Sequence, residues 1–344
     1  MTSRRTHAGL GGVVVVALLA CSGEMPRPRD AGRDGEGGPP PAATRLDETI
    51  RRAMAWTATL DVHPLRLREE KGMKGIKHMV EYLNFLDVVF RWSGDPDVRH
   101  TARERALATL RVANDDAYHN LAAVDDRRFK QDSMSYLRAC VLAEQFEADT
   151  RRYRLEIEKI LPRLHAHLPA RGIDQRMGFA VLLGQLGLPA PERETDVYPR
   201  SLIAQQVPMS YYLSAPDRPY DITHEIFAMT RRGTQPFPFR SEDEERYART
   251  MVRQLLSHFM QGGNVDLSAE FLVNLAQLGE ARSALARQAR EFIFQSQNPD
   301  GSFGNYSRAG IVMRQRNPRY DVRIGGNLHT TLVCIWALVE TAPD

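Results

Sequence analysis

The sequence predicts an all-α protein, built as an α/α toroid in which inner and outer helices alternate along the chain. Three observations favour this fold. Apolar residues recur at spacings of three and four, which is the helical period, and no long run alternates apolar and polar residues as a strand does. Apolar helices also alternate with more polar ones in hairpins of about 40–50 residues, a spacing typical of repeat architectures.

Six apolar segments are predicted to form the inner helices. They are "GIKHMVEYLNFLDVVF" (75–90), "DSMSYLRACVLAEQF" (132–146), "DQRMGFAVLLGQLG" (174–187), "DITHEIFAMTRRG" (221–233), "DLSAEFLVNLAQLG" (266–279) and "GNLHTTLVCIWALVE" (326–340). Helices this apolar are buried on most sides. Four segments begin with Asp, a favoured N-cap, and three end with Gly, a favoured C-terminal stop. The predicted caps are Asp132, Asp174, Asp221 and Asp266.

More polar segments are predicted to form the outer helices. They cover residues 46–58, 97–112, 151–166, 242–261 and 282–297. Residues 188–218 are rich in Pro and Tyr, so a long loop is expected where the outer partner of the fourth inner helix would lie. The alternative fold is an open α-solenoid of the same hairpins, although six repeats favour a closed ring.

The N-terminus has the pattern of a secretory signal. Arg4 and Arg5 precede an apolar run over residues 9–20, which is too short to cross a bilayer as a helix. "LLAC" resembles the lipobox of bacterial lipoproteins, which implies a lipid such as palmitate on Cys21; the alternative is an ordinary signal peptide. Ser22 follows the cysteine, and by resemblance to the lipoprotein sorting rule this implies the outer membrane of the bacterial cell envelope.

Composition divides the chain into three parts. Residues 1–20 are the expected signal peptide, and residues 21–44 form a tether that is too rich in Pro and Gly to fold alone. Residues 45–344 are long enough for one toroid domain with a substantial core, which we expect to be monomeric.

Charge and cysteine content add two expectations. The formal net charge is +3, and loss of Arg4 and Arg5 with the signal would leave about +1, which argues against a nucleic-acid partner. Cys140 and Cys334 could pair in an exported protein, but both lie in apolar helical runs, so buried free thiols are favoured.

Two C-terminal motifs resemble known families. "QSQNPDGSFG" (295–304) resembles the QxxDGSF/W motif of terpenoid cyclases and protein prenyltransferases. "NLHTTLVCIWAL" (327–338) resembles the final helix of prenyltransferase beta subunits, whose histidine binds zinc and corresponds to His329. The resemblance implies an α/α toroid and makes His329 a candidate zinc ligand. The families' Asp-x-Cys zinc pair and aspartate-rich motif are absent, so prenyl or terpenoid chemistry is the least supported activity.

Alignment of the six inner helix starts suggests a site. The fourth position reads His78, Ser135, Met177, His224, Ala269 and His329, and the fifth reads Met79, Tyr136, Gly178, Glu225, Glu270 and Thr330. In a toroid these positions form a ring at one mouth of the barrel, and closure makes the sixth helix a neighbour of the first. We therefore expect three histidines to meet at the mouth, with His329 close to His78.

The expected mouth suits polar chemistry. Converging helix N-termini favour an anionic or polar ligand and should lower histidine pKa values. Three His, or two His with a carboxylate, would bind zinc with one open position, and the same groups without metal would serve as general acid and base. The candidate catalytic residues are His78, His224, Glu225 and His329, the candidate zinc ligands are His78, His224 and His329, and the candidate ligand-binding residues are Tyr220, Asp221, Glu270 and Arg323. The structural alternative is that each histidine is a hydrogen-bonded core residue and each aspartate only a cap.

Two loops lead to this mouth. Residues 205–221 carry Tyr211, Tyr212 and Tyr220, which would either stack on a sugar or lipid or pack against the barrel. Residues 304–327 carry several arginines and would form either an anion-recruiting lid or a solvated surface loop; these are Arg308, Arg314, Arg316, Arg319 and Arg323.

The sequence leaves two main functions open. The first is an extracytoplasmic enzyme of the hydrolase or lyase type, acting on a polar small molecule or glycan. The alternative is a lipoprotein that binds a ligand or a partner without turnover.

Overall fold

The computed structural model describes residues 42–113, 115–305, 315 and 317–342. The chain divides into two units, Met1–Pro39 and Pro40–Asp344, and all described residues belong to the second. The predicted signal peptide, Cys21 and the tether up to residue 41 lie outside the described residues. Residues 42–44, which were assigned to the tether, instead begin helix α1 (Ala42–Thr57).

The described residues form helices and contain no strand, so the prediction of an all-α fold is confirmed. The six predicted apolar helices are α3 (Gly75–Trp92), α5 (Asp126–Gln145), α7 (Ile173–Gln185), α10 (Arg218–Met229), α12 (Val265–Leu275) and α15 (Leu328–Glu340). The longer polar helices are α1, α4 (Pro96–Val112), α6 (Arg151–His167), α11 (Glu242–Gln261) and α13 (Ala284–Gln295).

Shorter pieces connect them. They are α2 (Pro64–Glu69), α8 (Glu194–Val197), α9 (Met209–Tyr212), the 3₁₀ turns η1 (Leu168–Ala170) and η2 (Tyr198–Arg200), and the π-helical turns η3 (Ala276–Glu280) and η4 (Arg323–Asn327). The predicted loop 188–218 therefore contains two short α-helices. No helix in the described part of the chain is both long and apolar enough to cross a bilayer.

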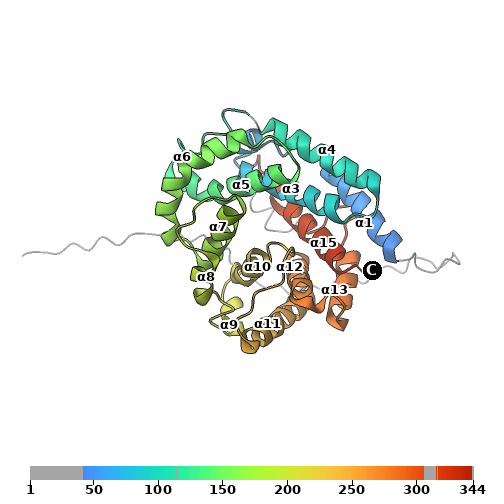
Figure 1. Ribbon diagram of the computed structural model, residues 1–344. Coiled ribbons are helices and arrows are strands. Elements are labelled where there is room, and N and C mark those ends of the chain that lie inside the picture. Colours follow the sequence, from blue (N-terminus) through green and yellow to red (C-terminus); the bar gives the residue numbers. More distant parts are fainter. Residues whose placement is uncertain (1–41, 114, 306–314, 316, 343–344) are drawn as a thin grey trace, which may run out of the picture. The chain divides into compact units, whose positions relative to one another are not determined.

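The apolar helices contact one another in sequence order. α3 packs against α5, α5 against α7, α7 against α10, α10 against α12 and α12 against α15, and α15 packs back against α3 (Figure 1). Polar helices cover them: α4 contacts α3, α6 contacts α5, α11 contacts α12, α13 contacts α12 and α15, and α1 contacts α15. The last apolar helix is thus a neighbour of the first.

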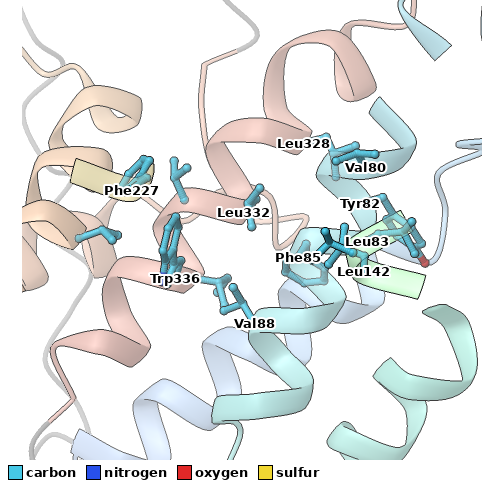
Figure 2. Close-up of a cluster of buried hydrophobic side chains, with 14 of the residues drawn as sticks. Val80, Tyr82, Leu83, Phe85, Val88, Leu142, Phe227, Leu328, Leu332 and Trp336 are labelled. Carbon is cyan, nitrogen blue, oxygen red and sulfur yellow. The ribbon is translucent and has the colours of Figure 1, made fainter. Parts of the chain in front are cut away.

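A large hydrophobic cluster holds these helices together. Figure 2 shows side chains from both members of the α3–α15 pair within it, with Leu83 and Phe85 on one helix and Leu332 and Trp336 on the other. Trp336 is only 1% exposed. Each buried side chain of this size stabilises the fold by roughly 1.5–3 kcal/mol, so the interface between these two helices contributes strongly to stability.

The two cysteines belong to the same core. Cys140 and Cys334 are buried free thiols, as the sequence analysis favoured. Burial raises the pKa of Cys140 to about 12, and the pKa of Cys334 also lies well above its ordinary value. Both side chains therefore act as small apolar core residues.

The segment 295–304 ties α1 to α15. Gln297 donates to the carbonyl oxygens of Thr49 and Gly301 at 3.0 Å, and the backbone N–H of Phe303 donates to Thr331 Oγ1 at 2.9 Å. Gly301 has a φ of 94°, and a Cβ there would lie 2.3 Å from the carbonyl oxygen of Arg52. Only glycine fits this close approach of two backbones.

The aspartates predicted as helix caps are not caps. The observed N-cap residues are Asp125 for α5, Gly172 for α7, Asp217 for α10 and Asn264 for α12. Because α5 begins at Asp126, Asp132 lies inside that helix. Asp174, Asp221 and Asp266 lie within the first turns of their helices, and all three line a cavity. Where another residue caps the helix, as Asn264 does for α12, the aspartate is free to make other contacts.

Candidate functional site

A cavity of about 1280 Å³ is lined by side chains from all six apolar helices. Its lining includes both acidic and basic side chains, together with a larger share of apolar surface. His329 lies on its wall near the start of α15. This histidine is the centre of the densest cluster of ionisable groups that borders the cavity.

His329 lies between three carboxylates. Its Nε2 atom is 3.0 Å from Glu270 Oε1 and 3.9 Å from Asp266 Oδ1. Its Nδ1 atom is 3.4 Å from Glu81 Oε1. The carboxylates come from two helices, α12 for two of them and α3 for the third, and both helices contact α15. The imidazole is thus fixed in orientation from both sides of its ring.

Hydroxyl groups orient the two carboxylates on α12. Thr223 donates to Glu270 Oε2 at 2.5 Å. Tyr220 donates to Asp266 Oδ2 and Thr330 to Asp266 Oδ1, both at 2.7 Å. Each carboxylate therefore has an oxygen held by a neutral donor, while Glu270 Oε1 and Asp266 Oδ1 lie near the histidine.

Glu81 forms the other side of the cluster. It is 5% exposed, and its Oε2 atom lies 2.9 Å from His78 Nδ1. Its Oε1 atom is 3.2 Å from Lys77 Nζ. Among the described residues, Lys77 is the one lysine or arginine within ion-pair distance of Glu81, Glu270 or Asp266. The three carboxylates thus gather more negative charge than lysine and arginine side chains neutralise.

The carboxylates control the protonation of His329. Burial opposes its charged form, but the charge of Asp266 and the contacts with Glu270 and Glu81 raise the pKa of His329 well above its ordinary value. Burial likewise opposes ionisation of the two glutamates. Lys77, His329 and His78 nevertheless hold the pKa of Glu81 well below its ordinary value. The contact with His329 also lowers the pKa of Glu270. The expectation that helix N-termini lower histidine pKa values is wrong at His329, because carboxylates in contact outweigh more distant dipoles.

The three expected histidines do not meet as one set. His78 and His329 come together, as the contact of α15 with α3 predicts, but they do so through Glu81. His224 is exposed to the cavity, and its ring centroid lies 6.1 Å from that of Tyr220 and 6.3 Å from that of Phe227.

Glu225 is directed away from the cavity. It accepts hydrogen bonds from the backbone N–H groups of Leu202 at 2.8 Å and Ile203 at 3.4 Å. Burial raises the pKa of Glu225 to about 8. The predicted catalytic role of Glu225 is therefore not supported, because the long loop before α10 supplies donors that bind its carboxylate elsewhere.

The remaining predicted residues have mixed positions. Tyr220 and Glu270 join the cluster, and Asp221 lines the cavity while accepting from Tyr211 at 3.2 Å. Tyr212 is buried and bonds to Tyr247, so it packs rather than forming a lip.

The predicted arginine lid is only partly described. Arg323 forms an ion pair with Asp321 at 3.0 Å. Arg319 is exposed. Arg308, Arg314 and Arg316 lie outside the described residues.

The ligand atoms around His329 are spaced for one metal ion. Among the described residues, the group that could share an ion is Asp266, Glu270 and His329, with ligand atoms within 4.8 Å of one another. Two ligands of a tetrahedral zinc ion lie about 3.4 Å apart, since each bond is about 2.0–2.2 Å. The observed separations from Nε2, 3.0 and 3.9 Å, bracket this value. Glu81 on the other ring nitrogen matches the carboxylate that orients a metal-binding histidine in many proteins.

The sequence analysis missed Glu81. A signal for it exists in the sequence, because Glu81 follows His78 by three residues within a largely apolar helix. Residues at that spacing share a helix face, and an acidic residue on a buried face needs a partner.

A family model described as "Domain of unknown function (DUF6895)" matches residues 50–339. That span includes Glu81, Asp266, Glu270 and His329. No curated protein and no solved structure matches the chain.

Proposed function

The chain belongs to the DUF6895 family, and we propose that it is a zinc-dependent hydrolase of the bacterial cell envelope. The observation that carries this proposal is the contact of His329 with Glu81 on one ring nitrogen and with Glu270 and Asp266 on the other. This arrangement, on the wall of a large cavity, supplies three protein ligands and leaves room for a water and a substrate.

Asp266, Glu270 and His329 would hold the ion. Zinc in such a site supplies a Lewis acid that activates water and polarises the bond to be cleaved. The other residues act around it. Tyr220 and Thr330 keep the Asp266 carboxylate in place. Glu81 Oε1, 3.4 Å from Nδ1 of His329, would favour the tautomer that carries its proton on Nδ1, which leaves Nε2 to face the ion.

His224 is suited to proton transfer. It lies on α10, faces the same cavity and interacts electrostatically with Glu270. An exposed imidazole close to the metal ligands can give a proton to a leaving group. His224 thus keeps its predicted catalytic role without being a metal ligand.

The α/α toroid belongs to this proposal. It is supported by the order of contacts among the apolar helices, in which α15 returns to α3, and by the contribution of all six to one cavity. The segment 295–304, which resembles a motif of toroid families, joins α1 to α15 through hydrogen bonds.

The lipid anchor also belongs to this proposal and rests on the N-terminal sequence. Cys21 after "LLA" would carry the lipid, and the Pro- and Gly-rich segment behind it would separate the enzyme from the outer membrane. Labelling of cells with radioactive palmitate tests this part. Label on the wild-type protein and none on a Cys21→Ser variant is the expected result, and equal labelling would contradict it.

Metal analysis of the purified full-length protein tests the proposed site. Elemental mass spectrometry should find about one zinc ion per chain in the wild type. The His329→Gln and Glu270→Gln variants should each lose most of this zinc. His258→Gln changes an exposed histidine and should keep the metal. Retention of zinc by both site variants would contradict the proposal.

Turnover is tested separately. Chromogenic esters, phosphoesters, amides and glycosides, each incubated with the zinc-loaded protein, should include one class that is cleaved by the wild type but not by Glu270→Gln. Zinc binding without any cleavage would favour the alternative of a ligand-binding lipoprotein.

A further inference from the structure

Two further arginines, Arg138 and Arg232, line the same cavity. We propose that Arg138 and Arg232 bind an anionic group of the cavity's ligand, either a carboxylate or a phosphate. The inference concerns the ligand of the same cavity, but it does not depend on metal binding or turnover, because both arginines line the cavity apart from the His329 cluster.

Arg138 on α5 has no acidic partner among the described residues. Its Nε and Nη2 atoms both donate to the single oxygen Asn84 Oδ1, at 3.0 and 2.8 Å. The amide oxygen fixes the guanidinium but carries no charge to neutralise it. One edge of this planar, positively charged group is thus held by the protein, and the rest borders the cavity.

Arg232 reaches the cavity from an unusual turn after α10. Arg231 and Arg232 have positive φ values of 46° and 58°, and Gly233 follows at 84°. Left-handed conformations are disfavoured for residues with a Cβ and tend to occur at functional sites. The turn places the guanidinium of Arg232 over the ring of Trp336, 4.2 Å from its centroid.

The nearest acidic residues are occupied. Asp87 accepts two hydrogen bonds from Arg91, at 3.1 and 2.6 Å. Glu340 accepts from Trp336 Nε1 at 2.5 Å, and burial raises its pKa to about 7. Both carboxylates therefore act on the arginine pair through their charge, but among the described residues neither forms an ion pair or hydrogen bond with Arg138 or Arg232.

The arginines stay charged at neutral pH. Burial, with a contribution from Arg91, lowers the pKa of Arg138 to about 10. Burial and the charge of Arg138 lower the pKa of Arg232 to about 9. An oxyanion between them would accept several N–H groups in the planar geometry that guanidinium favours, and would relieve their repulsion.

The helix rise gives the distance from the zinc site. Trp336 follows His329 by seven residues on α15, which is about 10 Å along the axis, and Asn84 follows Glu81 by three residues on α3, which is about 4.5 Å. A ligand whose anionic group is bound by the arginines could therefore place a second group at the His329 cluster, if one or two rings separate the two groups.

One phenylalanine ring lines the same cavity as the arginines. This residue is Phe227, and its ring centroid lies 4.7 Å from that of the buried Trp336 (Figure 2). The expected ligand thus combines an oxyanion with an apolar or ring-shaped body.

Isothermal titration calorimetry of the purified full-length protein tests this inference. The probes are benzoate and phenyl phosphate, with benzyl alcohol as the neutral analogue. We expect at least one of the two anions to bind at least tenfold more tightly than benzyl alcohol, and the tighter anion identifies the favoured group. Arg138→Gln and Arg232→Gln should each weaken that binding about tenfold or more.

Two further variants make the outcome decisive. Arg246→Gln removes an exposed arginine of α11 and should leave the anion affinity unchanged within about twofold. His329→Gln should also keep the affinity, because the arginines and not the metal hold the anion. If Arg138→Gln fails to fold, Arg232→Gln decides alone.

Two results would overturn the inference. One is equal binding of benzyl alcohol and both anions. The other is that His329→Gln loses anion binding while both arginine variants keep it. That result would assign the anion to the metal and leave the proposed zinc site intact.

Discussion

Glu81 Oε1 lies 3.4 Å from Nδ1 of His329, while Glu270 Oε1 lies 3.0 Å from Nε2 on the other side of the same ring. The two glutamates come from helices that are distant in sequence, α3 and α12, and both pack against α15. One nitrogen of this histidine therefore faces a carboxylate, and the other faces two potential metal ligands. The proposed metal site depends on this relationship.

Zinc affinity should increase with pH. Because its carboxylate neighbours raise the pKa of His329 well above the ordinary value, zinc must displace a proton from Nε2 at neutral pH. We expect the association constant to increase about tenfold per pH unit until the pH reaches the pKa of the histidine in the metal-free protein. Calorimetry in buffers of different ionisation enthalpy would measure the released proton, and an affinity independent of pH would contradict the prediction.

Tyr220→Phe should weaken zinc binding without removing a ligand. The change deletes the 2.7 Å hydrogen bond to Asp266, and loss of such an orienting contact typically costs about tenfold or more in metal affinity. Tyr198→Phe is the matched control, since it removes a hydrogen bond to Glu244 instead. Equal zinc affinities for the two variants, measured by competition with a chelating dye, would show that Tyr220 does not position the ligand.

Glu225→Gln should change how stability depends on pH. The pKa of Glu225 is about 8 in the folded protein against an ordinary value of 4.5, so the folded state binds the additional proton between these values. The contribution of Glu225 to the free energy of unfolding is therefore fully present below about pH 4.5. This contribution decreases as the pH rises and is lost once the pH passes about 8.

The size of this effect between pH 5 and pH 9 is on the order of 4 kcal/mol, because the folded pKa lies about three units above pH 5 and one unit corresponds to about 1.4 kcal/mol. Urea unfolding at pH 5 and pH 9 would measure it. The difference between the two pH values should shrink by that amount in Glu225→Gln but not in Glu48→Gln, which alters an exposed carboxylate. An unchanged difference in Glu225→Gln would mean that the carboxyl ionises normally.

Gly301→Ala should strongly destabilise the fold. Its φ of 94° disfavours a Cβ, and the added atom would lie 2.3 Å from the carbonyl oxygen of Arg52, so α1 must shift. Gly187→Ala separates the two effects, because Gly187 has a φ of 67° with nothing within 4 Å of the added atom. We expect losses of about 3 kcal/mol or more for the first variant and about 1 kcal/mol for the second in thermal unfolding. Similar losses in both would argue against the backbone contact.

Helix content could be predicted from the sequence because the apolar period is strong in each of the six inner segments. The proximity of His78 and His329 could be predicted as well, since it follows from the order of the repeats once the sixth helix contacts the first. Both predictions rest on backbone arrangement, which the hydrophobic pattern determines.

Side-chain directions could not be predicted in the same way. Glu225 and Glu270 occupy equivalent positions in the alignment, yet one binds the N–H groups of Leu202 and Ile203 and the other binds His329. The difference comes from the connection before α10, which supplies the N–H groups that bind Glu225. The caps were mispredicted for a related reason, because Asn264 occupies the cap of α12 and leaves Asp266 for the site.

An X-ray anomalous difference map at the zinc absorption edge tests the central claim most directly. Crystals of the full-length protein, grown with zinc, should show one strong peak about 2.0–2.2 Å from His329 Nε2 and from a carboxylate oxygen of both Asp266 and Glu270. No peak there, or a peak on other residues alone, would contradict the assignment of this cluster as a metal site.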